Sequence, residues 1–402
     1  MNQSTRNASI ACGVAALLLL TPACGSDDSS SGSGGGSGSG GAGGGSSGGA
    51  AGSAGAGGTS SGGGGGATGG GGGSGGGAGG LGGGQGLKET IVFQRGGQSS
   101  EVPPGPGGEV LVMNFDGKSE TNLTNTQQKN EGRPVFSLDA KWVAYDEQSS
   151  PYPYPYASKI CTMAAVGGSV TCLGDGKSWD GMPAFSPDGK LIAFVSTRDG
   201  SPYPTWQDAK AEIYVMNADG TAVTRLTNDT ALDIHPAFSP DGKSIVFASN
   251  RDAPPYPQKK DIYTMNANGT GITRLTHGEG DNGEPTFSPD GKSIVFVSDR
   301  DGHDEIYLMS ATGTAVTRLT TTSSSPYGNA VNGAPVFTHD GKYVLFHSNR
   351  DTKQATLYQI YVMNADGTGV TRLTNNNDSD THPTPAFGIP VGEPGGPGSQ
   401  IK

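Results

Sequence analysis

Short polar runs containing Ser, Asp and Lys return along the 402-residue chain, and such residue types can support nucleophilic or acid–base chemistry. The run at Ser186–Lys190 reads SPDGK, SPDG returns at Ser239 and Ser288, and altered copies stand at Ser137 and Thr338. Ser in the first place, Pro in the second and Gly in the last are typical of a type I turn. Because a catalytic group has no reason to recur in every repeat, we predict turns here rather than an active site.

The elements around these turns repeat with a fixed period of about 50 residues. Each repeat carries a Phe before the turn, an apolar run such as Ser244–Ser249, the run IYVMNADG (Ile213–Gly220) and TRLT (Thr224–Thr227). These runs are rich in β-branched and aromatic residues and predict four short strands per repeat, which is typical of a β-propeller. The marker residues are Phe136, Phe185, Phe238, Phe287, Phe337 and Phe387.

The two ends of the repeat region complement each other. Thr90–Arg95, Glu109–Asn114 and Thr121–Thr124 match the last three strands of a unit, and Thr384–Phe387 matches a lone first strand. Joined, they form one blade and leave no open sheet edge. We therefore predict an all-β fold: a six-bladed β-propeller of four-stranded antiparallel blades, closed by N- and C-terminal strands in one composite blade.

The repeat resembles that of TolB-type six-bladed β-propellers, whose units carry P-x-F-S-P-D-G-K, I-x-F-x-S-x-R-D-G, I-Y-x-M-N-x-D-G and R-L-T. Residues Pro183–Thr227 match this pattern nearly throughout, and the resemblance covers about Leu87–Pro390. It implies a fold more directly than a function, because the same repeat occurs in peptidase propellers and in some polysaccharide lyases.

Loop composition separates the two faces of such a ring. The first-to-second and third-to-fourth turns share one face and are short and uniform, whereas the connections on the other face vary. We assign function to this variable face, because binding residues favour variable loops on a rigid scaffold. Near the expected channel mouth, the candidate ligand-binding residues Arg133, His235, Glu284 and His382 precede the first strands. The alternative is buried or solvated side chains, and we expect no metal and no cofactor.

Tyr-Pro segments are the most distinctive content of the variable face. They run SPYPYPY (Ser150–Tyr156), SPYPTW (Ser201–Trp206), PPYP (Pro254–Pro257) and SPYG (Ser325–Gly328). Proline restricts a loop and Tyr offers a broad surface with a polar tip, which suits recognition. Packing of these rings on one another is the alternative. The candidate binding residues in these segments are Tyr152, Tyr154, Tyr156, Tyr203, Trp206, Tyr256 and Tyr327.

Two of the four cysteines lie inside the repeat region. Aligned repeats place Cys161 at the position of Tyr214 and Cys172 at the position of Arg225, and these positions face each other across a hairpin. We predict a disulfide between the third and fourth strands of that blade. Two buried free thiols are the alternative.

The N-terminal part differs in composition from the repeats. Residues 1–23 combine a basic residue with a short apolar stretch, which predicts a lipoprotein-type signal peptide with lipidation at Cys24. Plain secretion is the alternative. Residues 24–86 are mostly Gly, Ser and Ala and predict a disordered tether; 87–392 form the propeller and 393–402 a flexible tail.

The net charge of −11 and the absence of a basic run argue against nucleic acid as a partner. We expect an exported monomer, lipid-anchored to the cell envelope with the outer membrane favoured. It would bind a protein, peptide or envelope glycan without catalysis. The alternative is a polysaccharide-active enzyme of the oligogalacturonate-lyase type, with a metal at the channel mouth.

Overall fold

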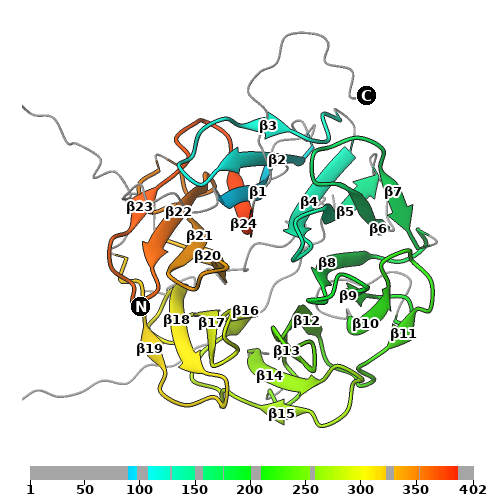
Figure 1. Ribbon diagram of the computed structural model, residues 1–402. Coiled ribbons are helices and arrows are strands. Elements are labelled where there is room, and N and C mark those ends of the chain that lie inside the picture. Colours follow the sequence, from blue (N-terminus) through cyan, green and yellow to red (C-terminus); the bar gives the residue numbers. More distant parts are fainter. Residues whose placement is uncertain are drawn as a thin grey trace, which may run out of the picture. The chain divides into compact units, whose positions relative to one another are not determined.

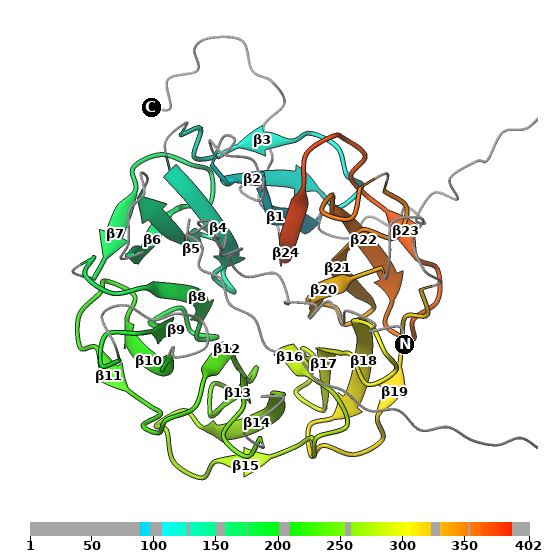
Figure 2. The same ribbon diagram turned by 180° about the vertical axis from the view of Figure 1, so that it is seen from behind.

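The computed structural model describes residues 89–96, 107–126, 129–149, 157–174, 176–200, 210–253, 259–322, 330–352 and 354–387. These residues form six four-stranded antiparallel sheets arranged around a central axis (Figures 1 and 2). Within this part of the chain, no helix is long and apolar enough to cross a membrane. The predicted all-β, six-bladed propeller is confirmed.

Five blades are continuous in sequence and are numbered here in chain order. Blade 1 contains β4 (Lys129–Phe136), β5 (Trp142–Ser149), β6 (Ser158–Ala164) and β7 (Thr171–Leu173). Blade 2 contains β8 (Asp180–Phe185), β9 (Leu191–Ser196), β10 (Glu212–Asn217) and β11 (Thr224–Arg225). Blade 3 contains β12 (Asp233–Phe238), β13 (Ser244–Ser249), β14 (Asp261–Asn266) and β15 (Thr273–Arg274). Blade 4 contains β16 (Asn282–Phe287), β17 (Ser293–Ser298), β18 (Glu305–Ser310) and β19 (Thr317–Arg318). Blade 5 contains β20 (Asn332–Phe337), β21 (Tyr343–Ser348), β22 (Gln359–Asn364) and β23 (Thr371–Arg372).

Blade 6 joins the two ends of the repeat region, as predicted. It consists of β24 (Asp380–Phe387), β1 (Glu89–Arg95), β2 (Glu109–Asn114) and β3 (Thr121–Asn122). The inner strand β24 pairs antiparallel with β1, from Glu89 opposite Phe387 to Arg95 opposite Asp380. An ion pair between the last two residues, 2.7 Å between Nε and Oδ1, adds to this closure.

The second strand of each blade is buried on both of its faces. In β13, five consecutive residues from Ile245 to Ser249 are buried, and β17 shows the same pattern. Neighbouring blades cover both faces of a sheet in a propeller, so these strands read as continuous apolar runs rather than alternating ones.

The outer strands are shorter than the TRLT runs predicted. In blade 2 only Thr224 and Arg225 pair with β10. The chain then turns away because the backbone N–H of Ile213 donates to the side-chain hydroxyl of Thr227 at 2.9 Å. A side-chain acceptor therefore replaces the next backbone rung of the sheet.

The SPDG runs are turns. In the run at Ser186, the N–H of Gly189 donates to the Ser186 carbonyl at 2.8 Å, and the Ser186 hydroxyl donates to Asp188 at 2.7 Å. The same hydroxyl accepts the N–H of Leu191, at the start of the next strand. The polar groups of the run are thus used to hold the corner of the backbone.

The Arg-Asp pairs after the second strands are also structural. The Arg251 guanidinium lies 5.2 Å from the ring centroids of both Phe247 and Tyr263 and donates to Asp233 at 2.7 Å. The following Asp252 accepts a hydrogen bond from the hydroxyl of Tyr263. These contacts join strands of one blade, and the arrangement recurs around Arg198, Arg300 and Arg350.

Candidate functional site at the channel mouth

A β-bulge interrupts the first strand of every blade, and these strands surround the centre of the ring (Figure 1). The register shift falls close to the start of the strand, where the chain enters from the variable face. In each bulge a residue other than glycine has a positive φ, between 46° and 56°. A bulge redirects the side chain that it carries, so all six blades present a side chain at one level of the channel. The six residues are Arg133, Met182, His235, Glu284, Ala334 and His382.

The four candidate residues predicted near the mouth are therefore at equivalent places in the fold. Glu284 is the centre of the contacts between blades 3, 4 and 5. Its Oε1 lies 4.0 Å from Nε2 of His235, and its Oε2 accepts the backbone N–H of Ala334 at 2.5 Å. No cation from Lys or Arg forms an ion pair with this carboxylate among the described residues.

Blade 5 contributes a histidine that sequence reasoning did not select. Its bulge carries Gly333 and Ala334, and these small residues leave space at the mouth. The side chain of His347, from the second strand, fills this space. A Cβ added at Gly333 would lie 2.5 Å from His347 Nε2 and 3.3 Å from Glu284 Oε2. On its other side, the His347 ring is 5.4 Å from the ring of His382, centroid to centroid. His235, Glu284, His347 and His382 thus form a continuous arc, called the mouth arc below.

A signal for His347 was present in the sequence. It stands opposite Gly333 in the second strand, where blades 2, 3 and 4 have Val195, Ala248 and Val297. A histidine among these apolar residues is the exception that marks the site. Blades 1 and 6 also have a polar residue at this position, Asp146 opposite Gly132 and Gln94 opposite Thr381.

Burial determines the charge of the mouth arc. It lowers the pKa of His235 and of His347 to about 3 and that of His382 well below its usual value. Burial also raises the pKa of Glu284, opposed by the Ala334 N–H and by the charges of Lys260 and Arg133. The three imidazoles are therefore neutral at neutral pH and offer nitrogen lone pairs to a ligand.

The nearby cations are already paired. Arg133 forms a 2.7 Å ion pair with Asp146 and lies 5.4 Å above the Trp179 ring. Lys260 forms a 2.7 Å ion pair with Asp281. The structure brings Arg133 to the same level of the channel as the other candidates, but its charge is directed to Asp146 rather than to Glu284.

Asp304 is a further acidic group in this region that sequence reasoning missed. Its side chain is buried, and its pKa is raised to about 7 by burial and then by the charges of Glu284, Asp299 and Asp281. Its backbone carbonyl accepts from Asn332, at the entry of the inner strand of blade 5. Carboxylate and imidazole groups, which can donate electron pairs, therefore predominate on this side of the mouth.

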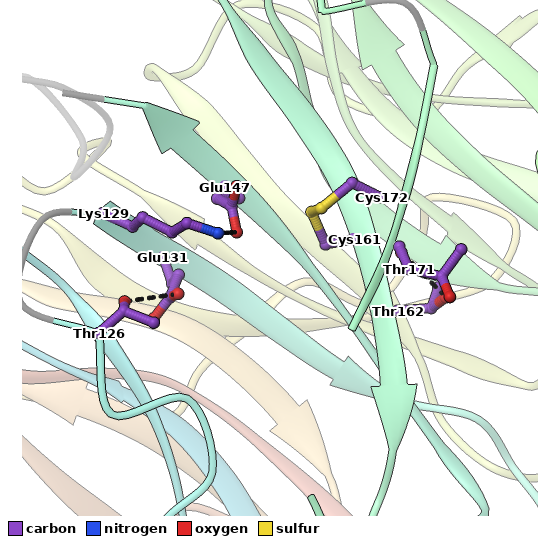
Figure 3. Close-up of a disulfide and its surroundings, with 8 residues drawn as sticks. All are labelled: Thr126, Lys129, Glu131, Glu147, Cys161, Thr162, Thr171 and Cys172. Carbon is purple, nitrogen blue, oxygen red and sulfur yellow. Dashed lines mark hydrogen bonds and ion pairs between the residues drawn. A yellow bond between two sulfur atoms is a disulfide. The ribbon is translucent and has the colours of Figure 1, made fainter. Parts of the chain in front are cut away.

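The structure describes only some of the remaining residues that were predicted from the sequence. Tyr152, Tyr154, Tyr156, Tyr203, Trp206, Tyr256 and Tyr327 lie outside the described residues, as does Cys24. Cys161 and Cys172 face each other in β6 and β7 and are joined by a disulfide (Figure 3). The disulfide replaces the Tyr–Arg cross-strand pair of blades 2 to 5, for example Tyr214 opposite Arg225.

The fold and the polar mouth define a six-bladed β-propeller with a candidate binding site at one end of its channel. A model of the Tricorn protease N-terminal β-propeller domain family matches residues 256–386. The chain is 33% identical over 147 residues to the Tol-Pal system protein TolB of Francisella tularensis, covering 37% of this chain and 31% of that protein. It is 28% identical over 126 residues to a TolB homolog of Chlorobium luteolum, covering 23% and 29%.

A solved structure gives the same result for the fold. TolB from Acinetobacter baumannii aligns with a TM-score of 0.58 at 23% identity, covering 74% of this chain and 66% of that one. The resemblance to TolB-type propeller repeats is thus confirmed. The chain spans less than a third of the length of these curated TolB relatives.

Proposed function

We propose that this protein is a non-catalytic binding module of the cell envelope. It would recognise a protein, peptide or envelope glycan through the variable face and the channel mouth. The observation that carries the proposal is the mouth arc, where polar side chains of blades 3 to 6 converge. The other polar residues that recur in the repeats form turns and contacts between strands. Similarity to TolB proteins, one of which is named as part of a Tol-Pal system, supports a binding role.

The proposal includes the way in which the module is held. The protein would be exported and anchored by lipid at Cys24, with the outer membrane favoured, and residues 24–86 would act as a tether. Replacing Cys24 by Ser should then move the protein from the membrane fraction to the soluble fraction. A Cys24→Ser variant that stays with the membranes would contradict the lipid anchor but leave the binding site untouched.

The binding role is tested with the soluble Cys24→Ser protein as bait for envelope extract, followed by affinity measurement with the purified ligand. We expect Glu284→Gln and the triple alanine variant at Tyr154, Tyr203 and Tyr256 each to weaken binding at least about tenfold. The control is Lys190→Ala, because this side chain is exposed in a turn on the opposite face.

Two results would contradict the proposal. Binding that falls with the Lys190 control and not with the mouth or loop variants would place recognition on the other face. Cleavage of oligogalacturonate by the same preparation, lost in the mouth variants, would favour the polysaccharide-active alternative.

A further inference from the structure

We propose that blade 1 binds a guanidinium group from outside the chain, at the place where the other blades hold an arginine of their own. The residues of this place are Glu131, Tyr145 and Glu147, and it is called the guanidinium position below. It lies towards the end of the second strand, which leads into the variable face. The inference goes beyond the proposed function, because the mouth arc takes its residues from blades 3 to 6.

The first observation is the arrangement in the other five blades, each of which holds a guanidinium over an aromatic ring of its second strand. In blade 2 the Arg198 guanidinium lies 5.2 Å and 5.0 Å from the ring centroids of Phe194 and Tyr214. It donates to the hydroxyl of Ser196 at 2.9 Å and to Asp180 at 3.0 Å. The guanidinium groups of the other four blades belong to Arg251, Arg300, Arg350 and Arg95.

Blade 1 keeps the surroundings of this arginine but has no arginine. The strand registers place Tyr145 where blade 2 has the aromatic ring. They place Glu131 and Glu147, which are opposite each other, where blade 2 has the aspartate and the serine. Ser149 stands at the arginine position, and residues 150–158 contain no Arg or Lys. Blade 1 has therefore gained a carboxylate and lost the cation that belongs beside it.

The second observation is a pair of buried oxygen atoms without a hydrogen-bond partner. They are Oε2 of Glu131 and the hydroxyl of Tyr145, in residues that are 1% and 0% exposed. Burial and then the charges of Glu131 and Glu147 raise the pKa of Tyr145, so its hydroxyl lies near both carboxylates. Buried polar groups are nearly always satisfied in folded proteins. A guanidinium has five N–H donors and could satisfy both oxygen atoms.

The carboxylates around the position attract a cation. Burial raises the pKa of Glu131, hydrogen bonds from threonine hydroxyls oppose this, and the charges of Glu109 and Glu147 add to it. The ionised carboxylate of Glu131 has no ion pair among the described residues, and a guanidinium would provide the missing positive charge. Lys129 pairs with Glu147 instead, 2.8 Å from Nζ to Oε2, and its side chain is 44% exposed (Figure 3).

The geometry favours a guanidinium over a metal ion. Within the part of the chain that the structure describes, Glu131 belongs to no group of three metal-ligating side chains whose atoms lie within 4.8 Å of one another. A guanidinium is planar, directs its donors to several sides and stacks on an aromatic ring, which Tyr145 supplies. The side chains of Arg198 and Arg251 are 27% and 15% exposed, so a group at this place in a blade borders on solvent.

The test measures the binding of small probes to the full-length protein by calorimetry. N-acetylarginine amide presents one guanidinium without charged ends, N-acetylcitrulline amide is its uncharged counterpart, and N-acetyllysine amide presents an ammonium. We expect the arginine probe to bind at one site per chain, at least about tenfold more tightly than the other two.

A further probe distinguishes the two sources of a guanidinium. It is a mixture of blocked pentapeptides with a central arginine and randomised flanking residues. Binding at least about tenfold tighter than that of the arginine probe would indicate a peptide partner, since flanking residues then add contacts. Equal binding would indicate a small guanidinium compound as the ligand.

Variants locate the site. Glu131→Gln and Glu147→Gln should each weaken binding of the arginine probe at least about tenfold, and Tyr145→Phe about three- to tenfold. Ser149→Arg would supply the guanidinium from the chain itself, so it should raise the thermal midpoint and weaken binding at least about tenfold. The matched control is Asp139→Asn, an exposed carboxylate in a turn of the same blade, which should leave binding unchanged. Folding of each variant is checked by its thermal midpoint.

Three outcomes would overturn the inference. They are an arginine probe that binds no better than the citrulline probe, unchanged binding in both glutamine variants and in Ser149→Arg, and loss of binding in Asp139→Asn. Binding that is lost in Glu284→Gln and kept in Glu131→Gln would also do so, because it would move the guanidinium to the mouth arc. Failure of the recognition experiment above, with the arginine probe bound at blade 1, would remove the proposed function and leave this inference standing.

Discussion

Replacing Asp233 by Asn should stabilise the protein at neutral pH. Where the third strand of one blade meets the first strand of the next, an acid–amide pair joins blades 3 and 4 and also blades 4 and 5. The amide of Asn282 donates to Asp261 at 3.2 Å, and that of Asn332 donates to Glu305 at 3.0 Å. Between blades 2 and 3 the pair is instead two carboxylates, Glu212 and Asp233, which share a cluster with Asp229.

The magnitude follows from the contacts at this interface. Both side chains are almost fully buried, and their repulsion at 4.8 Å or less is about 3.5 kcal/mol at an effective dielectric constant of about 20. The substitution weakens the 2.7 Å contact of Asp233 with Arg251, which keeps its 3.2 Å contact with Asp229. An amide oxygen still accepts from the arginine, as Asn282 does from Arg300. We expect a net gain of about 1–2 kcal/mol, because one new hydrogen bond to a charged acceptor is added and one ion pair is weakened.

The pH dependence gives a second readout. Burial raises the pKa of Asp233 above its ordinary 3.8, and the charge of Asp229 adds to this while Arg251 opposes it. The folded protein therefore binds more protons than the unfolded chain above pH 3.8, and this group reduces stability progressively as the pH rises. The advantage of Asp233→Asn should accordingly be small near pH 4 and grow as the pH rises.

The assay compares the thermal midpoints of wild type and Asp233→Asn from about pH 4 to 8, where each 1 kcal/mol corresponds to about 2–4 °C. Buried groups away from Asp233, including the mouth histidines, contribute equally to both proteins and cancel in the difference, whereas the titration of Glu212 changes with its neighbour. A variant that is less stable than wild type at neutral pH would refute the reasoning. A gain of equal size at every pH would show that it does not come from the carboxylate charge.

Three further perturbations test the fold and the mouth. Cys161→Ala should lower the free energy of unfolding by about 3 kcal/mol, because the disulfide closes a short loop; equal thermal midpoints with and without reductant in the wild type would contradict this. Arg300→Met should cost about 1–3 kcal/mol in urea unfolding through loss of two ring contacts and a hydrogen bond, and an unchanged midpoint would count against it. Gly333→Ala should lower stability by about 1–3 kcal/mol and displace His347, since the new Cβ would lie 2.5 Å from its Nε2; a crystal structure with the ring unmoved would show the contact to be harmless.

The sequence by itself determined the architecture. Turn residues such as Pro187 and Gly189 recur at a fixed interval, and the runs between them carry β-branched and aromatic residues. These signals come from residues that are close together in the sequence, so they can be recognised without knowing which distant residues are in contact. The lone first strand before Phe387 completed the count of blades, and the aligned repeats placed Cys161 opposite Cys172.

The outer strands show the limit of this reasoning. The TRLT run has the composition of a strand, but a side-chain hydroxyl takes the backbone N–H that would have continued the sheet. Strand propensity describes the residues of the run. It does not show that the hydroxyl of Thr227 in this run accepts the N–H of Ile213, which is 14 residues away in the third strand.

Which side chains meet at the channel mouth was decided only by the tertiary structure. His235, Glu284 and His382 come from three different blades, and the bulge that aims them is visible in the strand register rather than in composition. His347 comes from a second strand and reaches the mouth because Gly333 leaves room for it. Whether these groups meet depends on the closure of the ring, which sets distances between residues more than 100 positions apart and which no local pattern encodes.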